Sequence, residues 1–182
     1  MQNDLPKLLQ AISFAAKKHS KQKRKGADGQ PYVNHVLEVA NLLANVGKIE
    51  DYDVLIAAVL HDTIEDTETT KREITKLFGT TVSKYVSEVT DNKKLPKAKR
   101  KELQIKHAPH LSDNAKRIKL ADKISNIRDV SENPPAGWSD KRRLEYIDWG
   151  ERVINGVRGV NSNLEQYFDE TVVEARQKIE QS

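Results

Sequence analysis

The chain has 182 residues, with 31 Lys or Arg against 27 Asp or Glu, which gives a formal net charge of +4. This length fits one domain with a sizeable core. The absence of cysteine excludes disulfides, Cys-ligated zinc, iron–sulfur clusters and thiol catalysis, so any metal must take oxygen and nitrogen ligands. The mild positive charge suits an anionic partner without requiring nucleic acid. We find neither the apolar run of a signal peptide nor a membrane-spanning stretch, which predicts a cytoplasmic protein without a membrane partner.

Apolar residues recur at helical spacing along the chain, and no segment shows the alternation of a strand. The first helix is expected over residues 5–16, a basic loop over 20–30 and a second helix over 33–47. A third helix, expected from an Asp51 cap through Asp62, is apolar on nearly all sides, which indicates a central buried helix. Capping residues, among them Thr70, Ser112 and Ser139, delimit the others together with prolines and glycines. These are expected over residues 70–79, 82–89, 96–108, 112–130, 139–157 and 162–175, the last opened by a Ser162–Glu165 capping box.

The strongest chemical signal is the segment HDTIEDT, residues 61–67, at the end of the apolar third helix. On a continued helix Asp62, Glu65 and Asp66 share one face. Three crowded carboxylates repel one another unless a divalent cation, basic side chains or water compensates them. For an isolated His-Asp pair, however, a helix-capping histidine followed by solvated acids is the more common meaning.

Two residues elsewhere offer to complete a metal site. His35 lies on the edge of its helix with Val39 and Leu42, a partly buried position where a lone histidine is usually a satisfied core residue. Asp122 follows Ile118 by four residues and points along an otherwise apolar face, where a lone Asp usually caps a helix or pairs with a base. Together with the HD pair they supply two imidazoles and two carboxylates from three helices, a set that suits a divalent ion with positions open for water and phosphate.

The order H…HD…D resembles the HD superfamily of metal-dependent phosphohydrolases. Narrower matches, to the hydrolase domain of the RelA/SpoT family, are RKGADGQPYVNHVLEVA, LIAAVLHDTIEDT and KLADKISNIRD. The similarity spans nearly the whole chain and is greatest to small stand-alone alarmone hydrolases of the metazoan SpoT homologue type. It implies one all-α HD-type domain over residues 1–182, a bundle of about eight to ten helices. Its metal-binding core is expected at about 31–130, with C-terminal helices at about 139–180 closing the nucleotide cleft.

The resemblance also implies an activity, that of a guanosine-3′,5′-bis(diphosphate) 3′-diphosphatase. Such an enzyme removes pyrophosphate from guanosine tetraphosphate or pentaphosphate, leaves GDP or GTP, and so lowers the stringent-response alarmone. The implied cofactor is Mn²⁺, although these ligand types also accept Zn²⁺ or another divalent ion. The implied metal ligands are His35, His61, Asp62 and Asp122, and Glu65 and Asp66 are implied to act on the attacking water.

Basic and aromatic residues are candidates for holding the nucleotide. Asn126 lies one helical turn after Asp122. Trp138, Arg142 and Tyr146 follow one another at steps of four residues, which puts a guanidinium between two aromatic rings. Without the resemblance, such residues more often form a solvated loop, an ordinary polar helix position or a core stripe. The predicted substrate-binding residues are Arg24, Lys25, Asn126, Trp138, Arg142 and Tyr146, with Lys97 as a weaker candidate. We expect Trp149 to pack in the core, and His19, His107 and His110 to be surface histidines.

Other functions remain open at this point. Metal-dependent hydrolysis reads the phosphate more strictly than the base, so a phosphatase acting on the 2′- or 3′-phosphate of another nucleotide, such as NADPH, is the nearest alternative. A non-catalytic nucleotide sensor or a nucleic-acid-binding module is a further one. The intact acids Glu65 and Asp66 argue against the sensor, and basic residues scattered over several helices argue against nucleic acid. The oligomeric state is not indicated.

Overall fold

The computed structural model describes residues 4–181. Within that range the fold is all-α as predicted: it contains two isolated β-bridges and no strand. The elements are α1 (Leu5–Lys18), α2 (Val33–Asn45), α3 (Tyr52–Leu60), α4 (Thr63–Asp66), α5 (Lys71–Phe78), α6 (Thr80–Val89), α7 (Lys97–His107), the 3-10 turn η1 (Ala108–His110), α8 (Asp113–Glu132), α9 (Asp140–Asn155) and α10 (Ser162–Glu180).

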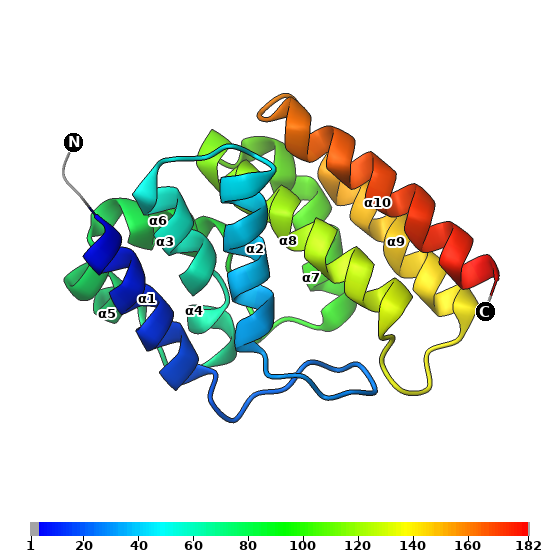
Figure 1. Ribbon diagram of the computed structural model, residues 1–182, viewed down its shortest axis with the longest axis horizontal. Coiled ribbons are helices and arrows are strands. Elements are labelled where there is room, and N and C mark those ends of the chain that lie inside the picture. The colour runs from blue at the N-terminus through cyan, green and yellow to red at the C-terminus, as the bar shows by residue number, and fades with distance from the viewer. Residues whose placement is uncertain (1–3, 182) are drawn as a thin grey trace.

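Two helices form the centre of the molecule. Every residue of α3 from Val54 to Leu60 is buried, as its almost uniformly apolar sequence predicts. Helix α8 is likewise buried along most of its length, although its sequence includes Lys119, Asp122 and Lys123. Helix α2 packs against both, and Figure 1 shows α9 and α10 on one side of α8 with α1, α5 and α6 at the opposite end of the molecule. The buried polar residues of α8 therefore face other helices rather than solvent.

Helix α3 is shorter than the sequence indicates. It ends at Leu60, and α4 begins at Thr63, so the predicted continuous helix through Asp62 is wrong. The reason is local hydrogen bonding. His61 donates through Nδ1 to the carbonyl of Ala58 at 2.7 Å, and Thr63 donates through Oγ1 to the carbonyl of Leu60 at 2.7 Å. These side chains donate to carbonyls at the helix end, where the carbonyl of Ala58 also accepts the backbone N–H of His61 at 3.5 Å.

Most of the predicted caps are present. Asp51, Thr70, Ser112 and Ser139 each accept a backbone N–H at the start of their helices. The last helix differs, because its cap is Asn161, which accepts from the N–H of Leu164 at 3.0 Å.

Glu165, expected to complete a capping box with Ser162, instead accepts backbone N–H groups from the preceding loop. The donors are Gly159, Val160 and Asn161, at 2.9, 3.1 and 3.1 Å from its Oε1. The predicted Ser162–Glu165 box is therefore replaced by an Asn161 cap and a carboxylate that closes the turn.

The basic loop between α1 and α2 folds back onto the connection between α8 and α9 (Figure 1). Gly26 forms an isolated antiparallel bridge with Pro135. A Cβ atom at position 26 would lie 2.4 Å from the carbonyl oxygen of Asn133, so this approach requires glycine. The loop is thereby fixed beside α8, which brings its basic residues to the candidate site.

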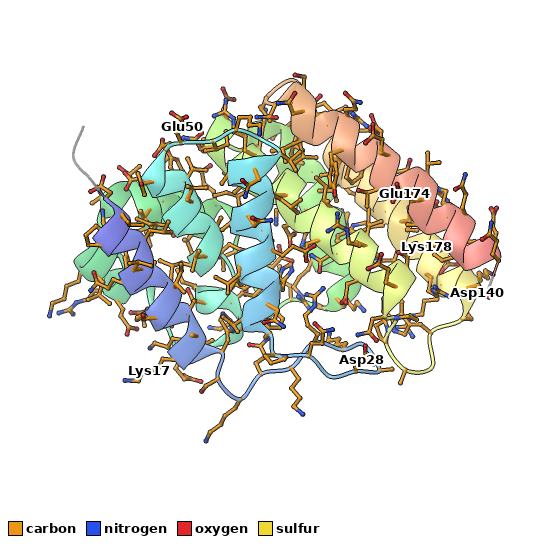
Figure 2. The ribbon with its side chains drawn as sticks, in the orientation of Figure 1. Lys17, Asp28, Glu50, Asp140, Glu174 and Lys178 are labelled. Atoms are coloured by element: carbon orange, nitrogen blue, oxygen red, sulfur yellow. The ribbon has the colours of Figure 1, made fainter. Side chains whose placement is uncertain are left out.

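The outer faces of the helices carry exposed charged side chains, such as Glu174 and Lys178 on α10 (Figure 2). Among the helices of residues 4–181, none combines the length and the apolar character that a membrane span requires.

Candidate active site

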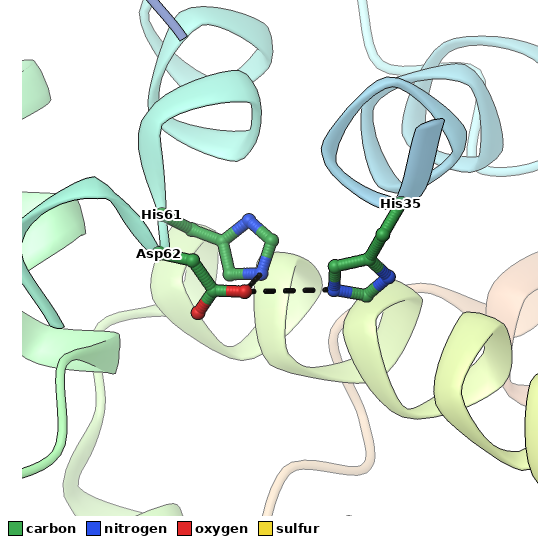
Figure 3. A group of neighbouring side chains, drawn as sticks. All are labelled: His35, His61 and Asp62. Atoms are coloured by element: carbon green, nitrogen blue, oxygen red, sulfur yellow. Dashed lines mark ion pairs between the residues drawn. The ribbon is translucent and has the colours of Figure 1, made fainter. Parts of the chain in front are cut away.

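Four predicted metal ligands converge between α2, α8 and the turn that joins α3 to α4. His35 Nε2 and His61 Nε2 lie 3.6 and 3.1 Å from Asp62 Oδ2, as the dashed lines in Figure 3 mark. Asp122 Oδ1 lies 3.3 Å from His35 Nε2 and 3.7 Å from His61 Nε2. His35 is 3% exposed and so lies deeper than the partly buried position expected from sequence. The chain therefore brings together two imidazoles and two carboxylates from distant segments.

The donor atoms fit a divalent ion. His35, His61 and Asp62 each offer one ligand atom, and these atoms lie within 4.8 Å of one another. Both histidine Nε2 atoms are buried and form no hydrogen bond in the described structure, an arrangement that is costly unless a further partner is present. Nitrogen and oxygen donors of these types bind Mn²⁺, Zn²⁺ and related ions. Asp122 is less free, because Lys123 Nζ donates to its Oδ2 at 2.9 Å.

The charges within this cluster are strongly coupled. Burial alone would lower the pKa of His61, but the carboxylates of Asp62 and Asp122 outweigh it and raise the pKa to about 10. Burial lowers the pKa of His35. Although burial opposes ionisation of Asp62, the neighbouring His61 and His35 hold its pKa well below the usual range. The ion pair between His61 and Asp62 is therefore one in which a bound cation can replace the imidazole proton.

The two acids after the HD pair lie on the short helix α4. Glu65 accepts from the backbone N–H of Asp91 at 2.8 Å, and Arg100 Nη1 lies 3.6 Å from its Oε1. Burial raises the pKa of Glu65 to about 7, a value suited to proton transfer near neutral pH.

Asp66 is held from two other segments. It accepts from Gln22 Nε2 at 2.9 Å, and Lys93 donates to its other oxygen. Because α4 is a separate helix, Glu65 and Asp66 are oriented independently of α3.

Asn126 and Arg24 lie together beside Asp122. Asn126 Nδ2 donates to Asp122 Oδ1 at 2.6 Å, one helical turn along α8 as predicted. Arg24 Nη2 donates to Asn126 Oδ1 at 3.1 Å and lies 2.8 Å from Asp129 Oδ2. The guanidinium therefore reaches α8 from the basic loop and places positive charge at the edge of the cluster.

A cationic and aromatic wall, defined here as Lys97, Lys101, Trp138, Arg142 and Tyr146, borders this region. The Arg142 guanidinium lies 4.4 Å and Lys97 Nζ 5.7 Å from the centre of the Trp138 ring. The rings of Trp138 and Tyr146 are 5.8 Å apart. Burial, followed by the neighbouring cations Lys25 and Arg142, lowers the pKa of Lys97.

The remaining candidates have mixed outcomes. Lys25 is exposed, and its positive charge contributes to lowering the pKa of Lys97. Trp149 is 6% exposed and packs in the core as predicted. His107 and His110 are exposed as predicted. The prediction that His19 is a surface histidine is wrong: it is 2% exposed, because the loop after α1 folds over it, and its Nδ1 lies 2.7 Å from Gln22 Oε1.

Several residues of the site escaped the sequence reasoning. Tyr32 Oη donates to Asp62 Oδ2 at 2.5 Å, and burial raises the pKa of this tyrosine. Its position three residues before His35 was an available signal, because that spacing puts both side chains on one side of the first turn of α2. Gln22 and Lys93, which hold Asp66, lie in loops far from it in sequence, where no periodicity applies. Lys123, which donates to Asp122, could not be told apart in the sequence from the other charged residues of its helix.

The fold and the paired histidines and aspartates define a metal-dependent hydrolase of the HD class. The HD domain family matches residues 11–145, and the chain belongs to it.

Within that class, several similar proteins of high identity share one name. The chain is 51% identical to the guanosine-3′,5′-bis(diphosphate) 3′-pyrophosphohydrolase MESH1 of Xenopus tropicalis, over 93% of this chain and 94% of that protein. It is 48% identical to the human MESH1 protein, over 91% and 93% of the two chains. The chain therefore belongs to the MESH1 family.

A solved structure described as a metazoan ortholog of SpoT that hydrolyzes ppGpp superposes with a TM-score of 0.90. Its sequence is 45% identical, and the match covers 92% of this chain and 94% of that one. The predicted resemblance to the RelA/SpoT family is confirmed.

Proposed function

We propose that this protein is a Mn²⁺-dependent guanosine-3′,5′-bis(diphosphate) 3′-pyrophosphohydrolase that degrades the stringent-response alarmone. The observation that carries the proposal is the convergence of His35, His61, Asp62 and Asp122 beside two partly buried acids, Glu65 and Asp66. Relatives that match more than nine-tenths of the chain are named for this activity. The water-derived oxygen is added to phosphorus, and the bond between that phosphorus and the ribose 3′-oxygen breaks.

In this proposal the four ligands hold the ion, which when bound lowers the pKa of water and neutralises charge on the phosphoryl oxygens. Glu65 and Asp66 orient the attacking water and move its proton, which fits the raised pKa of Glu65. Gln22 and Lys93 donate to the two oxygens of Asp66 and so fix the orientation of its carboxylate. The alcohol at the ribose 3′ position leaves with a proton, and pyrophosphate is the second product.

The nucleotide is proposed to lie against the cationic and aromatic wall. Arg24, Lys25 and Lys97 supply positive charge for the phosphates, and Asn126 supplies an amide beside the metal cluster. Trp138 and Tyr146 offer ring faces, with Arg142 stacked on the former. Helix α9 contributes Arg142 and Tyr146, and Trp138 lies in the connection just before it. That the helices over residues 139–180 close the nucleotide cleft, and that the protein is cytoplasmic, stay predictions from the sequence.

Turnover of guanosine tetraphosphate after chelation, with metals restored one at a time, tests the proposal. We expect restoration of activity by Mn²⁺ and release of pyrophosphate in equal amount to GDP. The same protein is offered NADPH as the competing substrate. Orthophosphate from NADPH with guanosine tetraphosphate untouched would contradict the proposed substrate. Full activity in the presence of chelator would contradict the proposed metal chemistry.

A further inference from the structure

The two histidines of the metal cluster are held by different partners. Each must present an unprotonated Nε2 to an ion, so each needs its proton on Nδ1. For His61 that proton is donated to the backbone carbonyl of Ala58, at 2.7 Å. For His35 the partner is a side chain: Nδ1 lies 2.9 Å from Ser125 Oγ. A carbonyl can only accept, whereas a hydroxyl can accept or donate, so the tautomer of His35 depends on what Ser125 bonds next.

Ser125 is 1% exposed and continues the chain of hydrogen bonds toward the surface. Its Oγ donates to Glu38 Oε2 at 2.6 Å. The other oxygen of Glu38, Oε1, accepts from Arg128 Nη1 at 2.7 Å. Arg128 also donates to the hydroxyl of Tyr167 on α10. Glu38 lies one helical turn after His35 on α2, and Arg128 lies three residues after Ser125 on α8.

In the series of hydrogen bonds from His35 to Arg128, the outermost residue determines which group donates and which accepts at each step. Arg128 has only donors, and an ionised carboxylate has only acceptors. The Ser125 hydroxyl must therefore donate to Glu38, which leaves its lone pairs to accept from His35 Nδ1. We propose that Ser125 and Glu38 are positioning residues that hold the metal-binding tautomer of His35. This inference rests on the metal site of the proposed function and adds two residues to it.

The Glu38→Gln substitution keeps the series of hydrogen bonds but reverses which group donates in it. An amide accepts at one atom and donates at the other, and Arg128 can pair only with the amide oxygen. The NH₂ group then faces Ser125 and donates to it, so the Ser125 hydroxyl turns to donate to His35 Nδ1. That arrangement moves the imidazole proton to Nε2, the atom that must bind the ion. A nearly isosteric change is therefore expected to be at least as harmful as Glu38→Ala.

The measurement is the dissociation constant of Mn²⁺ alone, obtained by competition with a chelator. Loss of an outer hydrogen-bond partner of a metal ligand typically weakens binding about 10- to 100-fold, and we expect losses in that range for Ser125→Ala and Glu38→Gln. Adding Arg128→Met to Glu38→Gln frees the amide oxygen to face Ser125, so the double variant is expected to bind Mn²⁺ more tightly than Glu38→Gln alone. Such a recovery is a coupling that a simple loss of packing does not produce.

Matched controls separate positioning from stability. Glu151→Gln makes the same change at a carboxylate paired with Arg176 at 2.5 Å and of similar side-chain exposure, 41% against 33% for Glu38. Ser83→Ala removes a hydroxyl that, like Ser125, is 1% exposed on a helix. Both controls are expected to keep the Mn²⁺ affinity. The melting temperature of each metal-free variant is recorded alongside, and Ser125→Ala decides the matter alone if Glu38→Gln does not fold.

The inference is overturned if Glu38→Gln and Ser125→Ala bind Mn²⁺ as the parent does, or if Glu38→Gln is milder than Glu38→Ala. Failure of the parent protein to bind Mn²⁺ would instead refute the metal site of the proposed function.

Discussion

The metal cluster and the cationic wall hold their side chains in opposite ways. In the cluster, His35 and His61 are at most 4% exposed, and each is fixed through Nδ1 by a hydrogen bond. On the wall, Lys97 and Arg142 are exposed and rest on an aromatic ring. Buried, hydrogen-bonded groups are preorganised for one geometry, whereas exposed cations adapt to an anion at modest energy. We therefore expect the cluster to control turnover and the wall to control affinity.

The largest effect is expected from Asp62→Ala. Its carboxylate lies within 3.6 Å of both histidine Nε2 atoms, so its removal deprives the ion of a charged ligand. Mn²⁺ affinity and turnover should fall together, turnover by more than the ~10²–10⁴-fold typical of losing an acid–base group. Chelator competition and product release measure the two. Glu68→Ala, an exposed acid two residues beyond Asp66, is the control. Retention of the metal by Asp62→Ala would count against the ligand assignment.

The next largest effect is expected from Glu65→Gln. Glu65 touches Asp91 and Arg100 rather than the histidines, so its amide should leave metal binding nearly intact. Turnover should fall by about 10²–10⁴-fold, because an amide cannot take up a proton from water. The same two measurements apply. Loss of the metal in Glu65→Gln would contradict the assignment of Glu65 as a catalytic acid that does not bind the metal.

The dependence of turnover on pH sharpens the role of Glu65. Burial raises its pKa to about 7, so the group is protonated below that pH and ionised above it. If the carboxylate is the base, kcat rises with pH through about 7, and the rise is absent in Glu65→Gln. A fall of kcat over the same range that disappears in Glu65→Gln would identify Glu65 as the acid instead.

The smallest effect is expected on the wall. Arg142→Ala removes a guanidinium stacked on Trp138, so KM should rise about 3- to 10-fold while kcat changes little. Steady-state kinetics at two salt concentrations measure this, because interactions of exposed charges weaken with ionic strength. The control is Arg158→Ala, a surface arginine paired with Asp169. An unchanged KM for Arg142→Ala would remove this residue from the nucleotide-binding set.

Periodicity and capping residues were enough to predict most of the fold, because α1 and α2 bury an apolar stripe and α3 is buried from Val54 to Leu60. Helix α7 buries no residue, and the prolines at positions 96 and 109 indicate its limits instead. They failed at the end of α3, where the side chains of His61 and Thr63 donate to the carbonyls of Ala58 and Leu60. For the last helix, the cap moved by one residue, because Asn161 reaches the N–H of Leu164.

The inward-facing histidines and aspartates of the candidate site could be predicted, because the helical spacing within a single segment reveals a polar residue on an otherwise apolar face. Residues that act through tertiary contacts could not. Lys93 meets Asp66, and Glu38 meets Ser125, only after the helices pack. His19 shows the same limit, since its burial depends on the loop that covers it.

The loop between α1 and α2 touches three working parts at once. Gln22 reaches Asp66, Arg24 reaches Asn126, and Tyr32 reaches Asp62. Its length is constrained by the contact between Gly26 and Pro135. An insertion anywhere along it would displace several reactive groups together, so this surface segment tolerates changes in length no better than the interior does.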